Sequence, residues 1–452
     1  MGEINCSGKW RFKNSLDEFL GELYIDKESR LIQIKLYYTS NWGDYKIDYK
    51  KSKIITGSFT NGFKITLLDL EFIRIIEHGM SNKVIVFNAK YAFQGLEYCK
   101  QDDLLFSKID YKVEELMVWS GLNGFNYAQN GNSDFNLTYC KKESYNFTLY
   151  DDTIVEIGGN LNRYPLDLER DKVELIQSVW ISIKSKNKNN IKYFQEVFRK
   201  IISLVAVGMG GFPKILEVVA CKEKEFSMNN HPISINCTNI NIFETSKVTW
   251  DDYLFYLKDL VNEERSIFDV WIKKYDKLIP IVELYLSLIC NKNVSLNRYF
   301  LTLIQALEGY HRRFICNDKA DFIKRIDMIC GKDIQKEKQY ICSYRQKTEF
   351  KYITLESRLM DLLLAEFKIV FINNYKKIEN NFVKRIVNTR NYLTHYDLNK
   401  EMGALRGDEL DKTCRYLKLV LEYYILLEIG IDTKKINEVV EKRIDLLKNR
   451  FR

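Results

Sequence analysis

The spacing of apolar residues changes along this chain, and that change limits which folds it can adopt. Up to about residue 155, short β-branched and aromatic runs alternate with Asn, Asp, Gly and Ser; the runs are LIQIKLYY, SKIITGSF, FKITLLD and KVIVFNAKYAF. A period of two is typical of strands with one buried face, and the polar residues between them favour turns. Residues 1–155 are therefore predicted to form an antiparallel, β-rich domain.

Residues 156–262 mix two periods. SVWISIKS and KILEVVACK indicate strands, and IKYFQEVFRKIISLVAVG between them indicates a helix. We predict a small α/β module, with the polar tract KSKNKNN as a solvated loop. The glycine-rich GMGGFP follows the helix instead of opening one, and no Lys-Ser or Lys-Thr pair comes after it. It therefore indicates a helix end and turn, not a phosphate-binding loop.

From Asp251 onward nearly every segment has helical periodicity. The clearest are WDDYLFYLKDLVNEERSIFDVWIKKYDKL, LNRYFLTLIQALEGYHRRFI, TLESRLMDLLLAEF and DELDKTCRYLKLVLEYYILLEIG. Pro280 is the only proline in this region, which favours long helices. We predict an all-α helical bundle for residues 263–452, and hence an α+β multidomain protein.

Composition excludes some classes of protein. With 46% hydrophobic residues the chain has enough apolar material to fold, and its net charge of +8 is compatible with nucleic acid without requiring it. The N-terminus has no signal-peptide core, and no run approaches the roughly 18 apolar residues of a membrane helix. We expect a cytoplasmic protein without a membrane partner. Ten scattered cysteines and four histidines lack metal-ligand spacing, so we expect reduced thiols, no metal and no cofactor.

Two residues of the helical region are supporting site candidates. His311 shares a predicted apolar helix face with Phe300, Ile304 and Leu307, where a hydrogen-bonded core histidine is more common than a catalyst. Glu308 lies at the edge of that face, where a carboxylate usually has a cationic partner. A solvated glutamate is an equally good interpretation.

The segment KRIVNTRNYLTHYD, residues 384–397, places an arginine within an apolar stripe. Arg390 falls near the middle of the helical arc marked by Val383, Ile386, Val387 and Leu393. Because a bundle face does not tolerate an unpaired guanidinium, an anion or another subunit should meet it.

Asn391 and His395 are four residues apart and stack on an adjacent face of the same helix. Arg390 and His395 are roughly 140° apart around a straight helix, so they do not form a dyad within one chain. Position alone is equally consistent with an interfacial salt bridge beside a surface histidine.

Arg390, Asn391 and His395 match the arginine, polar residue and histidine signature of the HEPN superfamily of metal-independent ribonucleases. LTLIQALEGYHRRF and VNTRNYLTHYD resemble the HEPN domains of ApeA-type bacterial anti-phage proteins. SGKWRFKN, GELYID and ITLLD are similar to the N-terminal domain that accompanies that HEPN domain. Residues 156–262 have no motif-by-motif match.

The resemblance implies an anti-phage endoribonuclease whose catalytic residues are Arg390, Asn391 and His395. It implies a homodimer with facing motifs, RNA as the substrate with tRNA first among candidates, and an N-terminal domain that senses a phage-derived trigger or restrains the nuclease. The chemistry agrees, because histidine exchanges protons near neutral pH and arginine binds phosphate through forked donors.

Two alternatives stay open. One is a non-catalytic HEPN module that dimerises or binds RNA, with the β domain as a ligand sensor. The other is a carbohydrate- or peptide-binding β domain joined to a structural bundle.

Overall fold

The computed structural model divides into two compact units, and each is described by itself. Unit 1 comprises residues 1–202 and 213–250, and unit 2 comprises residues 203–212 and 251–452. The structure describes residues 3–13, 15, 17–39, 53–59, 62–78, 82–130, 134–149, 152–163, 175–222, 232–238, 243, 248, 252–262, 265–291, 293–330, 352–365, 380–396 and 398–450.

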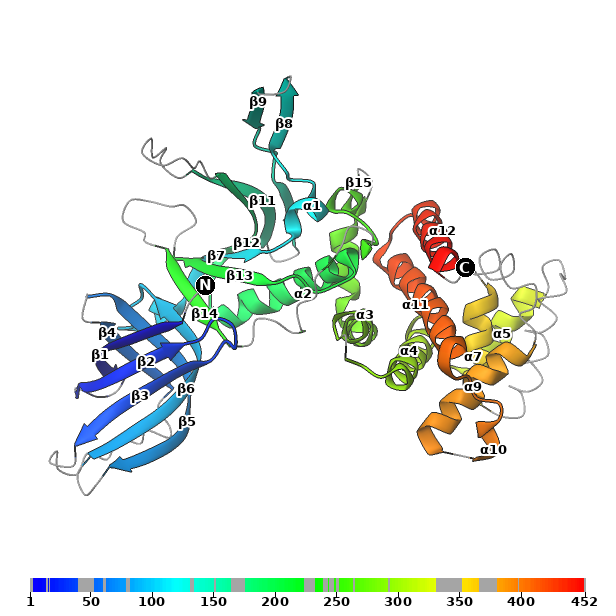
Figure 1. Ribbon diagram of the computed structural model, residues 1–452, viewed down its shortest axis with the longest axis horizontal. Helices are drawn as coiled ribbons and strands as arrows, with labels where there is room; N and C mark the ends of the chain where they lie inside the picture. Colours follow the sequence, from blue (N-terminus) through cyan, green and yellow to red (C-terminus); the bar gives the residue numbers. More distant parts are fainter. Residues whose placement is uncertain are drawn as a thin grey trace. The chain divides into compact units, whose positions relative to one another are not determined.

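Six long antiparallel strands form a closed sheet in unit 1 (Figure 1). They are β1 (Ile4–Phe12), β2 (Phe19–Ile25), β3 (Ile32–Thr39), β4 (Ile54–Phe59), β5 (Lys64–His78) and β6 (Asn82–Gln94). The hydrogen-bonded order is β6-β3-β2-β1-β4-β5, and β5 pairs again with β6 to close it.

Alternation places one face of each strand inside the closed sheet. In β3, Ile32, Ile34 and Leu36 are buried, as the predicted period of two requires. Trp10 of β1 is fully buried, and a Cβ added at Gly57 would lie only 2.4 Å from its ring. A side chain larger than hydrogen at residue 57 would displace the indole, which explains a glycine inside this strand.

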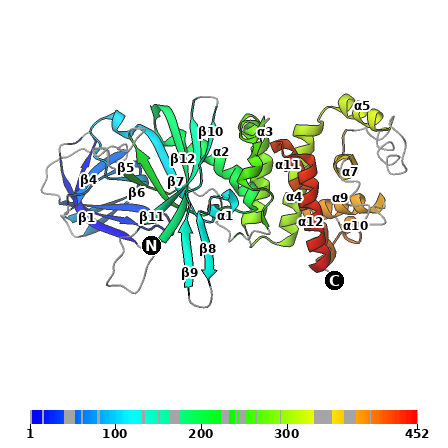
Figure 2. The same cartoon turned by 90° about the horizontal axis from the view of Figure 1, so that it is seen from above.

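A second antiparallel sheet continues from β6 in the order β14-β13-β7-β12-β11-β10. Its strands are β7 (Phe106–Val113), β10 (Tyr145–Thr148), β11 (Ile154–Arg163), β12 (Leu175–Asn189), β13 (Ile215–Cys221) and β14 (Ile233–Cys237). Between them lie the 3-10 turn η1 (Gln101–Leu104), the short helix α1 (Leu116–Ser120) and a separate hairpin, β8 (Phe125–Asn130) with β9 (Asp134–Tyr139). Figure 2 shows this hairpin extending away from the second sheet.

One prediction is corrected here, because KSKNKNN is not a loop. Its residues belong to β12, which runs to Asn189 and pairs with β7 through an irregular register beyond Lys184. Pairing with a neighbouring strand outweighs the polar composition. Strands from both sides of residue 155 lie in one sheet, and the division of the chain at residues 155 and 262 stays a prediction.

Helix α2 (Ile191–Met209) covers the second sheet. The ring of Phe198 stacks on that of Tyr111 of β7, with centroids 3.8 Å apart. The interpretation of GMGGFP is confirmed: the helix ends at Met209, and Gly210 follows with a left-handed φ of 70°. The Gly211 amide donates to the Ala206 carbonyl, which closes the helix end.

Unit 2 is mostly helical, and the predicted α+β class is confirmed. After η3 (Leu257–Leu260) and the two-residue strands β15 (Val261–Asn262) and β16 (Arg265–Ser266), its elements are α3 (Ile267–Cys290), α4 (Leu296–Tyr310), the π-turn η4 (His311–Ile315), α5 (Lys319–Cys330), α7 (Leu355–Ala365), α9 (Asn380–His395), α10 (Leu398–Glu401), α11 (Gly407–Ile429) and α12 (Thr433–Arg450). Residues 252–262 and 265–266 were predicted to be helical and are not part of an α-helix. The 3-10 turn and strand pair occupy them, and the first long helix begins at Ile267.

Helix α11 is the centre of this bundle. It packs against α3, α4 and α12, and residues on every side of it are buried. Glu422 is 1% exposed, and its carboxylate accepts hydrogen bonds from the Tyr285 hydroxyl at 2.7 Å and from Arg443 at 2.8 and 2.9 Å. Burial raises the pKa of Glu422, but the charges of Arg443 and Lys418 outweigh burial and hold it below its ordinary value.

Replacing this carboxylate should destabilise the bundle. Glu422→Ala leaves Arg443 buried without its anion, and we expect a loss of about 3–5 kcal/mol in the free energy of unfolding. Urea denaturation followed by helical circular dichroism measures it. Glu438→Ala, which removes an exposed glutamate of α12, is the matched control and should change little.

Because its folded pKa is depressed, the contribution of Glu422 is complete above its ordinary pKa of 4.5 and is lost as pH falls below it. The destabilisation by Glu422→Ala should therefore shrink in acid. Equal free energies of unfolding for Glu422→Ala and Glu438→Ala at neutral pH would contradict this role for Glu422.

Candidate functional site

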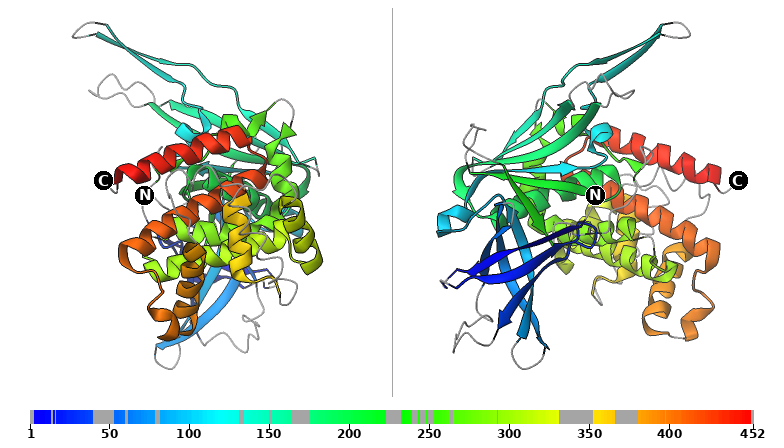
Figure 3. Two further views of the ribbon diagram at one scale, coloured as in Figure 1. Left: turned by 90° about the vertical axis from the view of Figure 1, so that its right-hand side faces the viewer. Right: turned by 60° about the vertical axis from the view of Figure 1, so that its left-hand side comes forward.

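The candidate site is built on α9, which packs against α4, α7 and α10. Figure 3 shows α9 and α10, both in orange, side by side. Val383, Ile386 and Thr389 are at most 1% exposed, so they mark the packed face, and Arg390 lies roughly 40° from its centre. Val387 and Leu393, which were expected on this face, are half-buried.

Thr389 explains why the packed face differs from the predicted one. Its hydroxyl donates to the Arg385 carbonyl at 2.7 Å and accepts from the Leu405 amide at 2.8 Å. Both hydrogen-bonding roles are thus satisfied inside the bundle, where a threonine without partners would be costly. The second bond fixes the chain that returns along α9, and Leu405 itself is buried.

Arg390 is half-buried at the edge of the packed face. Its Nη1 donates to the side-chain oxygen of Asn391 at 3.1 Å, and among the residues that the structure describes it has no carboxylate at ion-pair distance. By contrast, Arg385 one turn earlier forms a bidentate pair with Glu409 of α11. The guanidinium of Arg390 therefore keeps most of its donors for a ligand.

His395 is the last residue of α9, and its side chain is exposed. Within the described ranges its ring makes no hydrogen bond. The structure thus brings Arg390 and Asn391 into contact and leaves His395 on a different side of the helix, as the sequence spacing predicts.

Two tyrosines beside His395 were not among the site residues predicted from the sequence. Tyr396 has a left-handed φ of 51° and is 73% exposed, and its ring lies edge-on to Tyr392 at 6.0 Å. Tyr392 is held by a hydrogen bond to Glu401 and by Arg406 above its ring. An exposed aromatic ring of this kind can stack on the bases of single-stranded RNA. The segment NYLTHYD could have indicated them, because it has a tyrosine on each side of the histidine.

Glu308 and His311 lie elsewhere in the bundle. The Glu308 carboxylate pairs with Arg312 one turn later, at 2.8 Å. Neither residue contacts Arg390 or His395 in the part of the chain that the structure describes. Their supporting role in catalysis stays a prediction.

His311 is a fully buried residue in a polar network. Its Nε2 lies 2.9 Å from the Asp361 carboxylate, and Arg358 donates to its Nδ1 at 2.9 Å. Because an arginine only donates, Nδ1 must be unprotonated and Nε2 carries the proton. Burial lowers the pKa of His311, Asp361 raises it, and Arg358 lowers it further. The neutral imidazole therefore links η4, the turn that follows α4, to α7.

Comparison with known families gives two matches. Residues 5–271 match the family described as ApeA N-terminal domain 1, and residues 301–435 match Apea-like HEPN. The chain belongs to the ApeA family. The HEPN match contains Arg390, Asn391 and His395, and the two matches together support an anti-phage HEPN protein of the ApeA type. No curated protein and no solved structure gives a significant match.

The described residues show neither a membrane-spanning helix nor a metal site. None of the described helices is long and apolar enough to cross a bilayer. Within the same residues no three His, Cys, Asp or Glu side chains converge as metal ligands. The eight cysteines that are described are free thiols, and the side chains of Cys330 and Cys342 lie outside the described residues.

Substitution of His311 should lower the stability of the protein, whereas substitution of His395 should not. His311→Leu removes one hydrogen-bond partner from each of the buried Asp361 and Arg358, which keep their bonds to Arg325 and to the Cys316 carbonyl. We expect a loss of about 1–3 kcal/mol in the free energy of unfolding. His395→Ala removes an exposed side chain and should change stability by no more than about 0.5 kcal/mol. Urea denaturation of both variants measures the difference. A larger loss for His395→Ala would show that His395 has a structural role.

Proposed function

We propose that this ApeA protein is a homodimeric, metal-independent endoribonuclease that acts in the cytoplasm during anti-phage defence. The observation that carries the proposal is the placement of Arg390. Its guanidinium is half-buried, oriented by Asn391 and not neutralised by a described carboxylate, on the helix that ends at His395. A phosphate backbone supplies the missing negative charge.

RNA provides its own nucleophile. His395 accepts the proton of a ribose 2′-OH, the 2′-oxygen forms a bond to the adjacent phosphorus, and the bond from phosphorus to the 5′-oxygen breaks. The leaving 5′-oxygen takes a proton from water or from the partner's imidazolium. Arg390 stabilises the negative charge that develops on the phosphoryl oxygens, and Asn391 holds the guanidinium in place.

Two further elements come from the family resemblance. Structured RNA, with tRNA first among candidates, is the proposed substrate. The β-rich N-terminal region is proposed to sense a phage-derived trigger or to restrain the nuclease. The non-catalytic alternative, a HEPN module that only dimerises or binds RNA, is the outcome if substitution of both residues leaves function intact.

Purified protein should cleave total tRNA in EDTA and leave 2′,3′-cyclic phosphate ends. We expect Arg390→Ala and His395→Ala each to lower the rate by about 10²–10⁴-fold, because each removes charge stabilisation or proton transfer. Arg390→Lys should also fail, since a single ammonium does not reproduce the planar fork. Cleavage is measured on end-labelled tRNA, with the ends identified by ligation specific for cyclic phosphates.

Lys384→Ala is the matched control, because Lys384 is an exposed cation on the same helix, and it should keep full activity. Strict dependence on added Mg²⁺ would overturn the metal-independent mechanism. Full cleavage by both alanine variants would show that other residues carry the catalysis. Phage protection that survives in both variants, with no cleavage by the wild-type protein, would support the non-catalytic alternative.

Arg390 and His395 lie too far apart around α9 to act on one phosphate from a single helix, so each site should combine residues of two chains. An Arg390→Ala chain and a His395→Ala chain then form a heterodimer with one intact site. After subunit exchange, a mixture of the two inactive variants should recover about a quarter of wild-type activity.

A mixture of wild-type protein with the Arg390→Ala, His395→Ala double variant calibrates the exchange. No recovery in a mixture that demonstrably exchanges would show that each chain holds a self-sufficient site. A protein that is monomeric by sedimentation at concentrations where it is fully active would contradict the dimer itself.

A further inference from the structure

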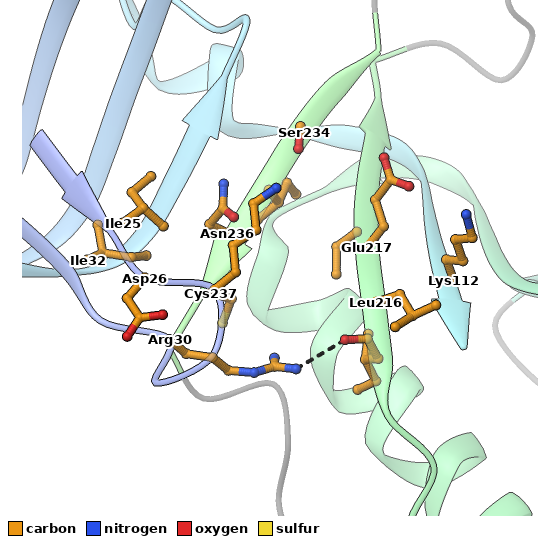
Figure 4. A pocket seen from close by; sticks show the side chains of 14 residues that line it. Ile25, Asp26, Arg30, Ile32, Lys112, Leu216, Glu217, Ser234, Asn236 and Cys237 are labelled. Atoms are coloured by element: carbon orange, nitrogen blue, oxygen red, sulfur yellow. Dashed lines mark hydrogen bonds between the residues drawn. The ribbon is translucent and has the colours of Figure 1, made fainter. Parts of the chain in front are cut away.

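A cavity of about 220 Å³ opens in unit 1 where the second sheet meets the closed sheet (Figure 4). It lies between β13 and β14, and the β2–β3 turn forms one of its walls. This cavity is distinct from the candidate site on α9.

The strand register explains the opening. β14 pairs with β13 at only two positions, Val219–Ser234 and Ala220–Ile233. Along its other edge β14 pairs with β6 of the closed sheet over Ser234–Cys237, while β13 continues along β7. Because its two neighbours diverge, β14 leaves β13, and the space between them is not filled by strand pairing.

Arg30 provides a positive charge at this cavity. It sits in the β2–β3 turn with a left-handed φ of 58°, a conformation that residues other than Gly, Asn and Asp seldom adopt. Its Nη2 donates to the Ile215 carbonyl at 3.1 Å, shown as the dashed line in Figure 4. Burial lowers the pKa of Arg30, and no carboxylate within the described residues is at ion-pair distance. An anion in the cavity would offset that burial.

Asp26, although it lines the same cavity, is already engaged. Its carboxylate accepts the Ser29 hydroxyl and the Glu28 amide, at 2.8 Å for the latter, and these bonds shape the turn that presents Arg30. Lys27 and Lys112 add two cations to the lining, and Glu217 adds the one other carboxylate. With Asp26 counted, the lining carries three cations and two carboxylates, which gives a net charge of +1.

Asn236 of β14 supplies an unused donor. Its side-chain nitrogen is buried and has no hydrogen-bond partner among the described residues. Buried amide groups are nearly always paired, so an orphan donor in the wall of a cavity indicates a ligand or a solvent molecule that accepts from it.

We propose that this cavity binds a small organic anion, with its phosphate or carboxylate group paired to Arg30 and a second acceptor bound by Asn236. Drug-sized sites occupy roughly 300–1,000 Å³, so a cavity of about 220 Å³ selects a smaller molecule. The proposal does not rest on nuclease activity, and its readout is binding.

The test is calorimetric titration of the full chain with three probes of similar size: ribose 5-phosphate, glutarate and neutral ribose. We expect at least one of the two anions to bind and ribose not to bind. Arg30→Gln should weaken binding by at least about tenfold, because it removes a charge-assisted contact. Asn236→Asp, which introduces a negative charge of nearly the same shape, should do the same.

Arg74→Gln, an exposed arginine on β5 outside the cavity, is the matched control and should bind like wild type. The two anionic probes decide between phosphate and carboxylate. No binding of either anion at about 10 mM, or equal binding by ribose, would overturn the proposal. An unchanged affinity in Asn236→Asp would also overturn it. Because Asn236→Asp keeps the contact of Arg30 to the Ile215 carbonyl, this variant tests the site even if Arg30→Gln fails to fold.

Discussion

The buried carboxylate of Glu422 is the interaction on which the helical unit depends. An ionised group at 1% exposure is tolerated only when partners replace its lost hydration, and Tyr285 of α3 and Arg443 of α12 provide them. Helices α3, α11 and α12 must therefore all be correctly packed for this buried charge to be stable. Helix α11 packs against α4, and α4 packs against α9. The position of the site residues on α9 therefore depends on the Glu422 cluster, which has no role in the proposed RNA cleavage.

Polar side chains perform similar positioning beside the candidate site. Thr389 ties α9 to the returning chain at Leu405, and Arg385 ties it to the first turn of α11 through Glu409. The Thr389 hydroxyl both donates and accepts within the fold, and the charge of Arg385 is paired with Glu409, whereas the Arg390 guanidinium has one hydrogen bond among the described residues, to Asn391. This difference in partners separates Arg385, which holds the fold, from Arg390, the arginine of α9 proposed to bind phosphate.

In unit 1 the corresponding constraint is that β6 serves two sheets. Its first half pairs with β3 and its second half with β14 along the same edge, while β5 pairs along the other. The closed sheet and the open sheet therefore share a strand, and the cavity at Arg30 and Asn236 follows from their divergence. Such an opening is a consequence of topology, since no single segment of the chain encodes it.

The sequence by itself determined the α+β class, the strand-to-helix change along the chain, the helix end at GMGGFP and the separation of Arg390 from His395 around α9. These follow from periodicities and local conformational preferences, which act over a few residues. The predictions from sequence were wrong for KSKNKNN, for residues 252–262 and 265–266, and for the centre of the packed face of α9. Only the tertiary structure decided these, together with the partners of His311 and Glu422 and the cavity beside β14. The pairing of β12 with β7, the bond between Thr389 and Leu405 and the partners of His311 and Glu422 all join residues far apart in the chain. Such bonds outweigh local preference because an unpaired polar group inside a protein costs more than a propensity term.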